Sequence, residues 1–98
     1  MNNLVEHPNH YNIPGRKECI VEMRERYGSY ITAIFCLTNS YKYLYRAGEK
    51  DGNPETQDKS KALWYFNYAK ELTNDGEGLI DAGAELYRDI KEEIENAD

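Results

Sequence analysis

The stretch that decides the fold of this 98-residue chain is residues 29–48, SYITAIFCLTNSYKYLYRAG. Ser29 is suited to cap the start of a helix and Gly48 to end one, so the stretch predicts a helix over about residues 30–47. Apolar and aromatic side chains recur along it at helical spacing, which predicts its buried face. That face is expected to contain Ile31, Ile34, Phe35, Thr38, Tyr41 and Tyr45, extended by Leu37 and Leu44.

A second pattern lies on the same predicted helix. Asn39, Lys42, Tyr43 and Arg46 occur at i, i+3, i+4 and i+7, so they share one face. This face carries an amide, two cations and a phenol but no acid, whereas a solvated face usually mixes both signs of charge. The combination is typical of phosphate or nucleotide binding. The alternative is that both cations are surface residues paired with acids elsewhere.

A shorter helix is expected before this one, over about residues 16–27. Gly15 releases the chain from an N-terminal segment in which Pro8 and Pro14 oppose helix formation. Gly28 is expected to end the helix as the residue after its last turn. The apolar positions predict a single buried face, made of Cys19, Ile20, Met23 and Tyr27.

Two further helices are expected after the turn-rich residues 48–54. Pro54 suits the first turn of a helix that runs to about Leu72, and residues 74–78 separate it from a last helix over about 79–96. We see no strand pattern, so the predicted class is all-α, with about four helices in a small helical bundle. The expected core positions are Ala62, Leu63, Phe66, Ala69 and Leu72 in the third helix, and Leu79, Leu86, Ile90 and Ile94 in the fourth.

The chain divides into three expected segments. Residues 1–14 form an extended N-terminal arm, residues 15–73 the helical nucleotide-binding core, and residues 78–98 an acidic amphipathic C-terminal helix. Gly83 inside that last helix costs about 1 kcal/mol relative to Ala, which a close helix crossing would compensate. Because a chain of this length buries a modest core, a homo-oligomer is expected, with sites between subunits.

The charge distribution limits the classes of partner. The formal net charge is −6, but residues 75–98 carry nine acidic and two basic side chains, so the rest of the chain is nearly neutral. A local positive site is therefore compatible with an acidic protein. The chain lacks the long basic stripe needed to bind duplex nucleic acid, and it lacks an apolar run of membrane-spanning length or a signal peptide. A cytoplasmic protein is expected, with Cys19 and Cys36 as buried free thiols.

Two further clusters are candidates for the same site. Asp58, Lys61 and Tyr65, followed by Tyr68, recur at helical spacing in the third helix. The alternative is that Asp58 and Lys61 form only a surface ion pair at i, i+3. The arm residues His7-Pro8-Asn9-His10-Tyr11 can fold over a site and place an imidazole near a phosphate, or they form a solvated surface arm.

Familiar cofactor motifs are absent from the sequence. It contains neither GxxxxGK[ST] nor GxGxxG, and its cysteines and histidines lack zinc-site spacing. Glu18, Glu22 and Glu25 fall on one helical strip, so Mg²⁺ is the candidate cofactor. The alternative is a solvated face compensated by nearby arginines, and no residue is assigned as a metal ligand. The arginines concerned are Arg16, Arg24 and Arg26.

Taken together, these motifs resemble the phage SaV-like small-protein family over about residues 7–70. That family is characterised by an HPxHY arm, a Glu-Cys-Ile helix, an N-x-x-K-Y-x-x-R-x-G-x-K block and a D-x-x-K-A-x-x-Y helix. The matching residues are His7, Pro8, His10, Tyr11, Glu18, Cys19, Ile20, Asn39, Lys42, Tyr43, Arg46, Gly48, Lys50, Asp58, Lys61, Ala62 and Tyr65.

The resemblance implies nucleotide binding in the cytoplasm of an infected bacterial host. The family includes a T7-type phage nucleotide kinase that phosphorylates deoxynucleoside monophosphates without a conventional phosphate loop. A kinase-like phosphotransferase acting on nucleoside monophosphates is therefore expected. The alternatives are a non-catalytic protein that sequesters nucleotides of host immune signalling, and an interaction protein that uses its acidic C-terminal helix.

The kinase expectation gives each candidate residue a role. His10 or Asp58 would orient or deprotonate the acceptor, and Tyr43 or Tyr65 would stack on the base. Phosphate charge would be neutralised by the cations, and the remaining ligand-binding positions would complete the site. The cations are Lys42, Arg46, Lys50 and Lys61, and the remaining positions are His7, Tyr11 and Asn39.

Overall fold

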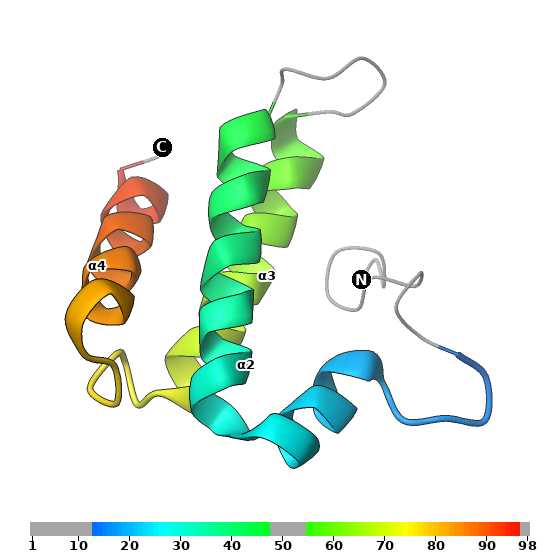
Figure 1. The fold of residues 1–98 in the computed structure, drawn as a ribbon. Coiled ribbons are helices and arrows are strands. Elements are labelled where there is room, and N and C mark those ends of the chain that lie inside the picture. The colour runs from blue at the N-terminus through cyan, green and yellow to red at the C-terminus, as the bar shows by residue number, and fades with distance from the viewer. Residues whose placement is uncertain (1–12, 48–54, 97–98) are drawn as a thin grey trace.

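The computed structural model describes residues 13–47 and 55–96 of the chain. These residues form three α-helices and no strand, which confirms the all-α class. The helices are α2 (Cys19–Arg46), α3 (Glu55–Leu72) and α4 (Asp81–Glu95), and Figure 1 shows their arrangement. Most of the expected N-terminal arm lies outside the described residues. The predicted count of four is not confirmed, because the helices expected over 16–27 and 30–47 form one kinked element.

The kink in α2 lies at Gly28. This residue has φ 92° and ψ 169°, which lies outside helical geometry, while helix continues on both sides. A positive φ is readily adopted by glycine and costly for other residues, so the sequence predicts the position of the break. After it, the Thr32 hydroxyl donates a hydrogen bond of 2.8 Å to the Gly28 carbonyl. The two parts of α2 consequently point in different directions (Figure 1).

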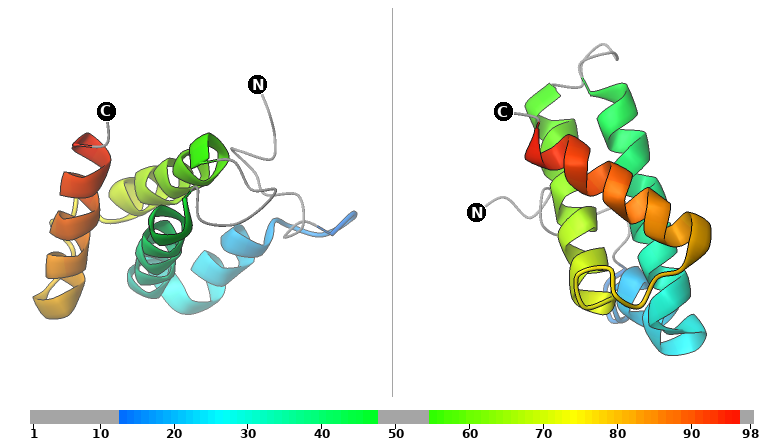
Figure 2. Two further views of the ribbon diagram at one scale, coloured as in Figure 1. Left: turned by 90° about the horizontal axis from the view of Figure 1, so that it is seen from above. Right: turned by 90° about the vertical axis from the view of Figure 1, so that its left-hand side faces the viewer.

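The second part of α2 and α3 lie side by side in all views (Figures 1 and 2). Small side chains line the contact and permit the two backbones to approach closely. The Ser40 hydroxyl donates a hydrogen bond of 2.7 Å to the Ala62 carbonyl across the interface. The side chains of the two helices that are at most 1% exposed are Thr32, Ala33, Cys36, Leu37 and Ser40 of α2 and Asp58, Ala62, Tyr65 and Ala69 of α3.

The predicted apolar face of α2 is confirmed in part: Leu37 is buried, Ile34, Phe35 and Leu44 pack against the core, and the other four residues are exposed. Ile31, Tyr41 and Tyr45 are 55%, 56% and 78% exposed, and Thr38 is exposed as well. The prediction weighted large apolar residues, but the side of α2 that packs on α3 combines small and polar residues with Leu37 and Tyr43. The residues buried instead include Thr32, Ala33, Cys36, Asn39, Ser40 and Tyr43.

The expected core of α3 is mostly confirmed. Ala62, Phe66 and Ala69 are buried, and Leu72 packs against the core from a partly buried position. Leu63 is 44% exposed, so its predicted place in the core is wrong. Its position on the helix circumference points away from the residues that contact α2.

Helix α4 crosses one side of the α2–α3 pair (Figure 2). Tyr87 and Ile90 bury its inner face, and the Tyr87 ring packs on Phe66 with centroids 5.1 Å apart. A Cβ built on Gly83 would lie 3.1 Å from Ile34 Cδ1, tighter than ordinary contact. The predicted reason for a glycine here, a close helix crossing, is thereby confirmed.

The two cysteines are both free thiols, but only one is buried. Cys36 is fully buried between α2 and α3, as expected. Cys19 is exposed at the start of α2, so its predicted burial is wrong. Of the described residues, no helix is both long and apolar enough to cross a membrane.

Candidate functional site

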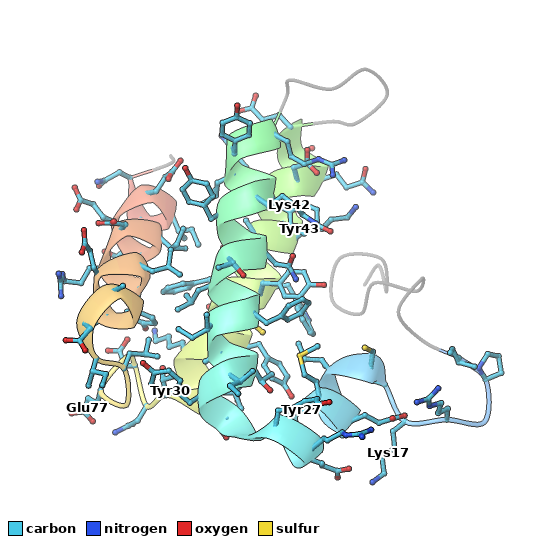
Figure 3. The ribbon with its side chains drawn as sticks, in the orientation of Figure 1. Lys17, Tyr27, Tyr30, Lys42, Tyr43 and Glu77 are labelled. Carbon is cyan, nitrogen blue, oxygen red and sulfur yellow. The ribbon has the colours of Figure 1, made fainter. Side chains whose placement is uncertain are left out.

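Three cations converge on the ring of Tyr43 where α2 meets α3. Lys42 Nζ lies 4.6 Å from the ring centroid, Lys61 Nζ lies 5.5 Å from it, and Arg46 Cζ lies 5.6 Å from it. Lys42 and Arg46 come from the end of α2, and Lys61 comes from α3, which runs in the opposite direction beside it. Figure 3 shows Lys42 and Tyr43 on the flank of α2 that borders α3. The antiparallel packing thus assembles a cation cluster from two segments of the chain.

A fully buried carboxylate supports this cluster. Asp58 is 0% exposed, and its Oδ2 lies 3.7 Å from Arg46 Nε, which is an ion-pair distance and longer than a hydrogen bond. The alternative of an Asp58–Lys61 surface pair does not apply, because Asp58 is not at the surface. Its position behind Arg46 makes it a residue that orients the guanidinium. The predicted role of Asp58 was to orient or deprotonate the phosphoryl acceptor. That role requires contact with the substrate, which a fully buried side chain does not have.

Tyr43 and Tyr65 form the floor of the cluster. Their rings stack at a centroid distance of 5.9 Å and an interplanar angle of 12°, and they are 4% and 1% exposed. Each ring therefore stacks on the other, and a nucleobase would have to displace one of them to take its place. We assign Tyr43 to holding the cations in position and Tyr65 to supporting the Tyr43 ring, which differs from the predicted stacking on a base.

Two buried N–H groups at this site have no hydrogen-bond acceptor among the residues that the structure describes. They are Asn39 Nδ2 and Arg46 Nε, and the Asn39 residue is only 9% exposed. Leaving such a donor unsatisfied costs about 1–3 kcal/mol, so native proteins rarely do it without a reason. Both donors belong to the predicted polar face of α2, and an anionic or carbonyl oxygen from a ligand would satisfy them.

An aromatic pair extends the site along α3. Trp64 and Tyr68 stack at a centroid distance of 5.5 Å, and the Trp64 ring also packs edge-on against Tyr65 at 5.0 Å. At the far end, Arg24 Nη1 donates a hydrogen bond of 3.3 Å to Tyr68 Oη. Burial raises the pKa of Tyr68, and the charge of Arg24 opposes that rise. The sequence reasoning missed Trp64, although its i, i+3 spacing from Lys61 could have identified it.

The structure therefore brings together most of the predicted site. Its described members, assembled along one α2–α3 flank, are Asn39, Lys42, Tyr43, Arg46, Asp58, Lys61 and Tyr65. The remaining predicted residues, His7, His10, Tyr11 and Lys50, lie outside the described part of the chain. Within residues 13–47 and 55–96, neither Lys42 nor Lys61 forms an ion pair with an acid.

The glutamates considered for Mg²⁺ are engaged elsewhere. Arg16 Nε and Nη2 donate hydrogen bonds of 2.7 and 2.9 Å to Glu22, and Lys17 Nζ donates one of 2.7 Å to Glu25. The Arg16 contact holds the pKa of Glu22 below its usual range. These pairs support the solvated-face interpretation, with Lys17 as an unpredicted partner. Among the described residues, no group of three His, Cys, Asp or Glu side chains could hold a metal ion.

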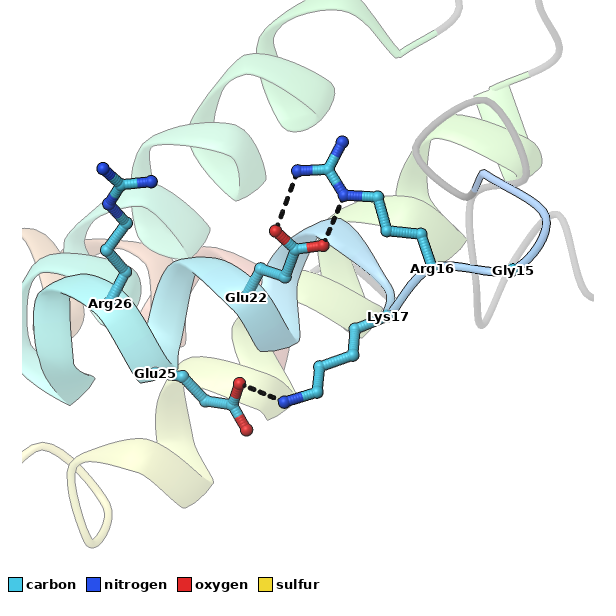
Figure 4. A pocket seen from close by; sticks show the side chains of 6 residues that line it. All are labelled: Gly15, Arg16, Lys17, Glu22, Glu25 and Arg26. Atoms are coloured by element: carbon cyan, nitrogen blue, oxygen red, sulfur yellow. Dashed lines mark hydrogen bonds and ion pairs between the residues drawn. The ribbon is translucent and has the colours of Figure 1, made fainter.

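The same residues line an open surface depression at the start of α2, with a volume of about 540 Å³ (Figure 4). Its lining is polar and charged, with both signs present, and its carboxylates are already paired with its cations. Its two carboxylates are paired with Arg16 and Lys17, so Arg26 is the lining cation outside these pairs, and the depression offers an anion less positive charge than the three cations at Tyr43 do. We therefore place the candidate site at the α2–α3 flank.

Comparison with known proteins identifies a family without an assigned activity. Residues 5–67 match the DUF3310 family, whose description is a protein of unknown function. The match includes the cation cluster and Trp64, while Tyr68 and α4 lie beyond it. No curated protein and no solved structure matches the chain.

Proposed function

Starting from the premise that this chain belongs to the DUF3310 family, we propose that it binds a nucleotide through its phosphate groups. The observation that carries this proposal is the convergence of Lys42, Arg46 and Lys61 on Tyr43, with one buried carboxylate in contact with the group. Three like charges held close together repel one another, and an anion placed between them would relieve that repulsion.

The chemistry of the cluster suits a phosphate in particular. A guanidinium presents several N–H donors in a plane, and two ammonium groups add compact charge, so together they match several phosphate oxygens. The unsatisfied Nε donor of Arg46 supplies a further hydrogen bond to the phosphate. Cation–π contacts with Tyr43 keep all three cations in place before the ligand arrives, which lowers the cost of ordering them on binding.

For the reaction, we propose a kinase-like transfer of a phosphoryl group between (deoxy)nucleoside phosphates. Such catalysis is mainly positioning plus stabilisation of negative charge, which a preorganised cation cluster can supply. The resemblance to the phage SaV-like family is the support for this step, and on the same ground we propose that the protein acts in an infected bacterial cell.

Sequestration of a nucleotide without conversion is the second candidate function. The observation that favours it is the burial of Asp58, the one candidate acid or base among the described site residues. A carboxylate with no exposed area is poorly placed to take a proton from an acceptor hydroxyl. In that case the protein would capture a signalling nucleotide of host immunity unchanged.

We further propose that the protein assembles with copies of itself through the outward face of α2. Ile31, Thr38, Tyr41 and Tyr45 are exposed there, and Ile34, which lies against Gly83 of α4, completes a row with steps of three and four residues. None of these five residues is charged in a chain whose net charge is −6, so two copies can approach on this face with little repulsion.

The test is a thermal-shift screen with nucleoside mono-, di- and triphosphates and cyclic dinucleotides, followed by mass spectrometry of each recovered ligand. We expect at least one nucleotide to raise the melting temperature. A converted ligand would establish the phosphotransferase, and an intact one the sequestering protein. If no nucleotide stabilises the protein, the proposed function is wrong.

Charge-removing variants locate the binding site. We expect Lys42→Gln and Lys61→Gln each to weaken nucleotide binding by about tenfold, because each removes one charge-assisted contact. Lys70→Gln is the matched control, since Lys70 is an exposed lysine in the last turn of α3. Equal losses in all three variants would indicate a general charge effect and would contradict the assignment.

A further inference from the structure

The aromatic pair Trp64–Tyr68 lies next to the cation cluster on the same helix. Lys61, Trp64 and Tyr68 occur at i, i+3 and i+7 of α3, so they follow one flank. Both aromatic residues are only partly buried, and their rings stack at 5.5 Å with an interplanar angle of 26°.

A continuous path of rings connects this pair to the cations. Tyr43 stacks on Tyr65 at 5.9 Å, and Tyr65 meets the edge of Trp64 at 5.0 Å and 87°. The cations hold one end of this path through Tyr43, and Arg24 holds the other through its hydrogen bond to Tyr68. The flank therefore runs from a charged end to a partly exposed aromatic surface.

This order of groups corresponds to the order of groups in a nucleotide. A phosphate requires cations, and a base requires an aromatic face together with hydrogen-bond donors or acceptors for its edge. The Asn39 amide supplies such a donor from α2, because its Nδ2 is buried and has no acceptor among the described residues. Tyr43 and Tyr65, which the sequence suggested for stacking, are too deeply buried to serve.

We propose that Trp64 and Tyr68 form the base-binding part of the site, so that a bound nucleotide spans from the cation cluster to this pair. This inference rests on the proposed function and adds to it the position of the base. It also assigns the site a preference for phosphates that carry an aromatic base over inorganic phosphate.

The position of Trp64 makes the inference directly measurable, because it is the only tryptophan in the chain. We would titrate the full-length protein with each of the four deoxynucleoside monophosphates and with inorganic phosphate, following tryptophan fluorescence and, in parallel, calorimetric binding. We expect nucleotides to quench the fluorescence and inorganic phosphate to bind with little change in it. Nucleotide binding by calorimetry without any fluorescence change would overturn the inference while leaving phosphate binding at the cations intact.

Variants separate stacking from a structural role. We expect Trp64→Leu to weaken binding of the nucleotides by about tenfold with little effect on inorganic phosphate, whereas Trp64→Phe keeps most of the affinity because it keeps an aromatic face. Tyr27→Leu is the matched control, since Tyr27 is 57% exposed in the first part of α2, before the kink. Equal nucleotide affinity in wild type and in Trp64→Leu would overturn the inference. If neither nucleotides nor phosphate bind the wild type, the proposed function fails together with it.

Discussion

The two thiols of this protein differ in environment although both are free. Cys36 is fully buried against α3, and burial raises its pKa to about 12. Cys36 is therefore protected from alkylation in two ways: reagents cannot reach it, and little of it is in the reactive thiolate form. Cys19 is exposed. We expect iodoacetamide at about pH 8 to alkylate Cys19 alone in the folded protein, as measured by mass spectrometry of tryptic peptides.

The control for this prediction is the Cys19→Ser variant. It should remain unmodified when folded and gain one adduct at Cys36 in denaturant. Comparable labelling of Cys36 in the folded protein would show that the α2–α3 contact opens readily.

At the residue scale, the sequence predicted which side chains share a flank but not how deeply each one lies. The spacing of Asn39, Lys42, Tyr43 and Arg46 sufficed to group them, because helical periodicity determines relative directions within one helix. Burial depends on the neighbouring helix, and the approach of α3 turned Asn39 and Tyr43 inward while leaving Lys42 exposed. Trp64 was missed because the pattern followed along this helix, Asp58, Lys61, Tyr65 and Tyr68, does not include it.

At the element scale, the kink at Gly28 can be tested by substitution. A Cβ built on Gly28 meets nothing within 4 Å, so a change to alanine introduces no clash. The φ of 92° nevertheless lies in a region that L-residues rarely adopt. We therefore expect Gly28→Ala to lower the free energy of unfolding by about 1 kcal/mol, measured by urea denaturation.

Gly78→Ala is the matched control for the kink. Its Cβ would meet only ordinary contacts, the nearest at 3.7 Å, and its φ is not positive. It should change stability much less than Gly28→Ala. A Gly28→Ala variant as stable as the wild type would mean that the two parts of α2 can join as one straight helix.

The attachment of α4 gives a pH-dependent prediction. The Tyr87 hydroxyl donates a hydrogen bond of 2.6 Å to Asp75 Oδ1, and Lys91 lies 3.5 Å from the same oxygen. Chiefly through the Tyr87 hydrogen bond, the pKa of Asp75 is lowered in the folded protein. The resulting stabilisation is present above the unfolded-state pKa of an aspartate and is lost as the pH falls through the lower folded-state pKa.

We therefore expect Asp75→Asn to lower the urea midpoint at pH 7, with the difference from wild type shrinking as the pH falls below the unfolded-state pKa of an aspartate, about 3.9, and the wild-type carboxyl becomes protonated. Asp89→Asn, on the exposed side of α4, serves as the control and should show a smaller change. A difference of constant size across this pH range would show that the charge of Asp75 contributes nothing.

The existence of the helices was more predictable than the faces they bury. Turn residues and apolar spacing located α3 and α4 closely, and Ile90 and Leu79 are buried as expected. In α2, either of two faces could form the buried side of the helix. One is lined mainly by large apolar residues, and the other contains more small residues. The sequence of α2 alone does not decide between them, because the choice depends on whether α3 packs closely through Ala62 and Ala69 or at a greater distance.

At the scale of the whole molecule, the consequence of that choice is an apolar face of α2 directed away from α3. Ile34 of this face lies against Gly83 of α4, whereas Ile31, Tyr41 and Tyr45 remain exposed. The residues of this face at 31, 34, 38, 41 and 45 alternate steps of three and four, the spacing with which helices pair in coiled coils. Thr38 fits such a face, because its hydroxyl already donates to the carbonyls of Ile34 and Phe35 within its own helix. A partner would meet mainly its methyl group.

If a second copy covers this face, the assembly should depend on it. We expect the wild type to sediment as an oligomer and Ile31→Glu to shift it toward monomer, because each subunit would bring a carboxylate into an apolar contact. Leu63→Glu is the matched control, since Leu63 is similarly exposed but lies on α3. Sedimentation velocity at several concentrations, with circular dichroism to confirm helix content, measures both variants.

A wild type that stays monomeric throughout would contradict self-assembly, whereas dissociation by Leu63→Glu alone would place the interface on α3. If Ile31→Glu becomes monomeric yet binds nucleotide normally, each subunit must contain a complete site on its own α2–α3 flank.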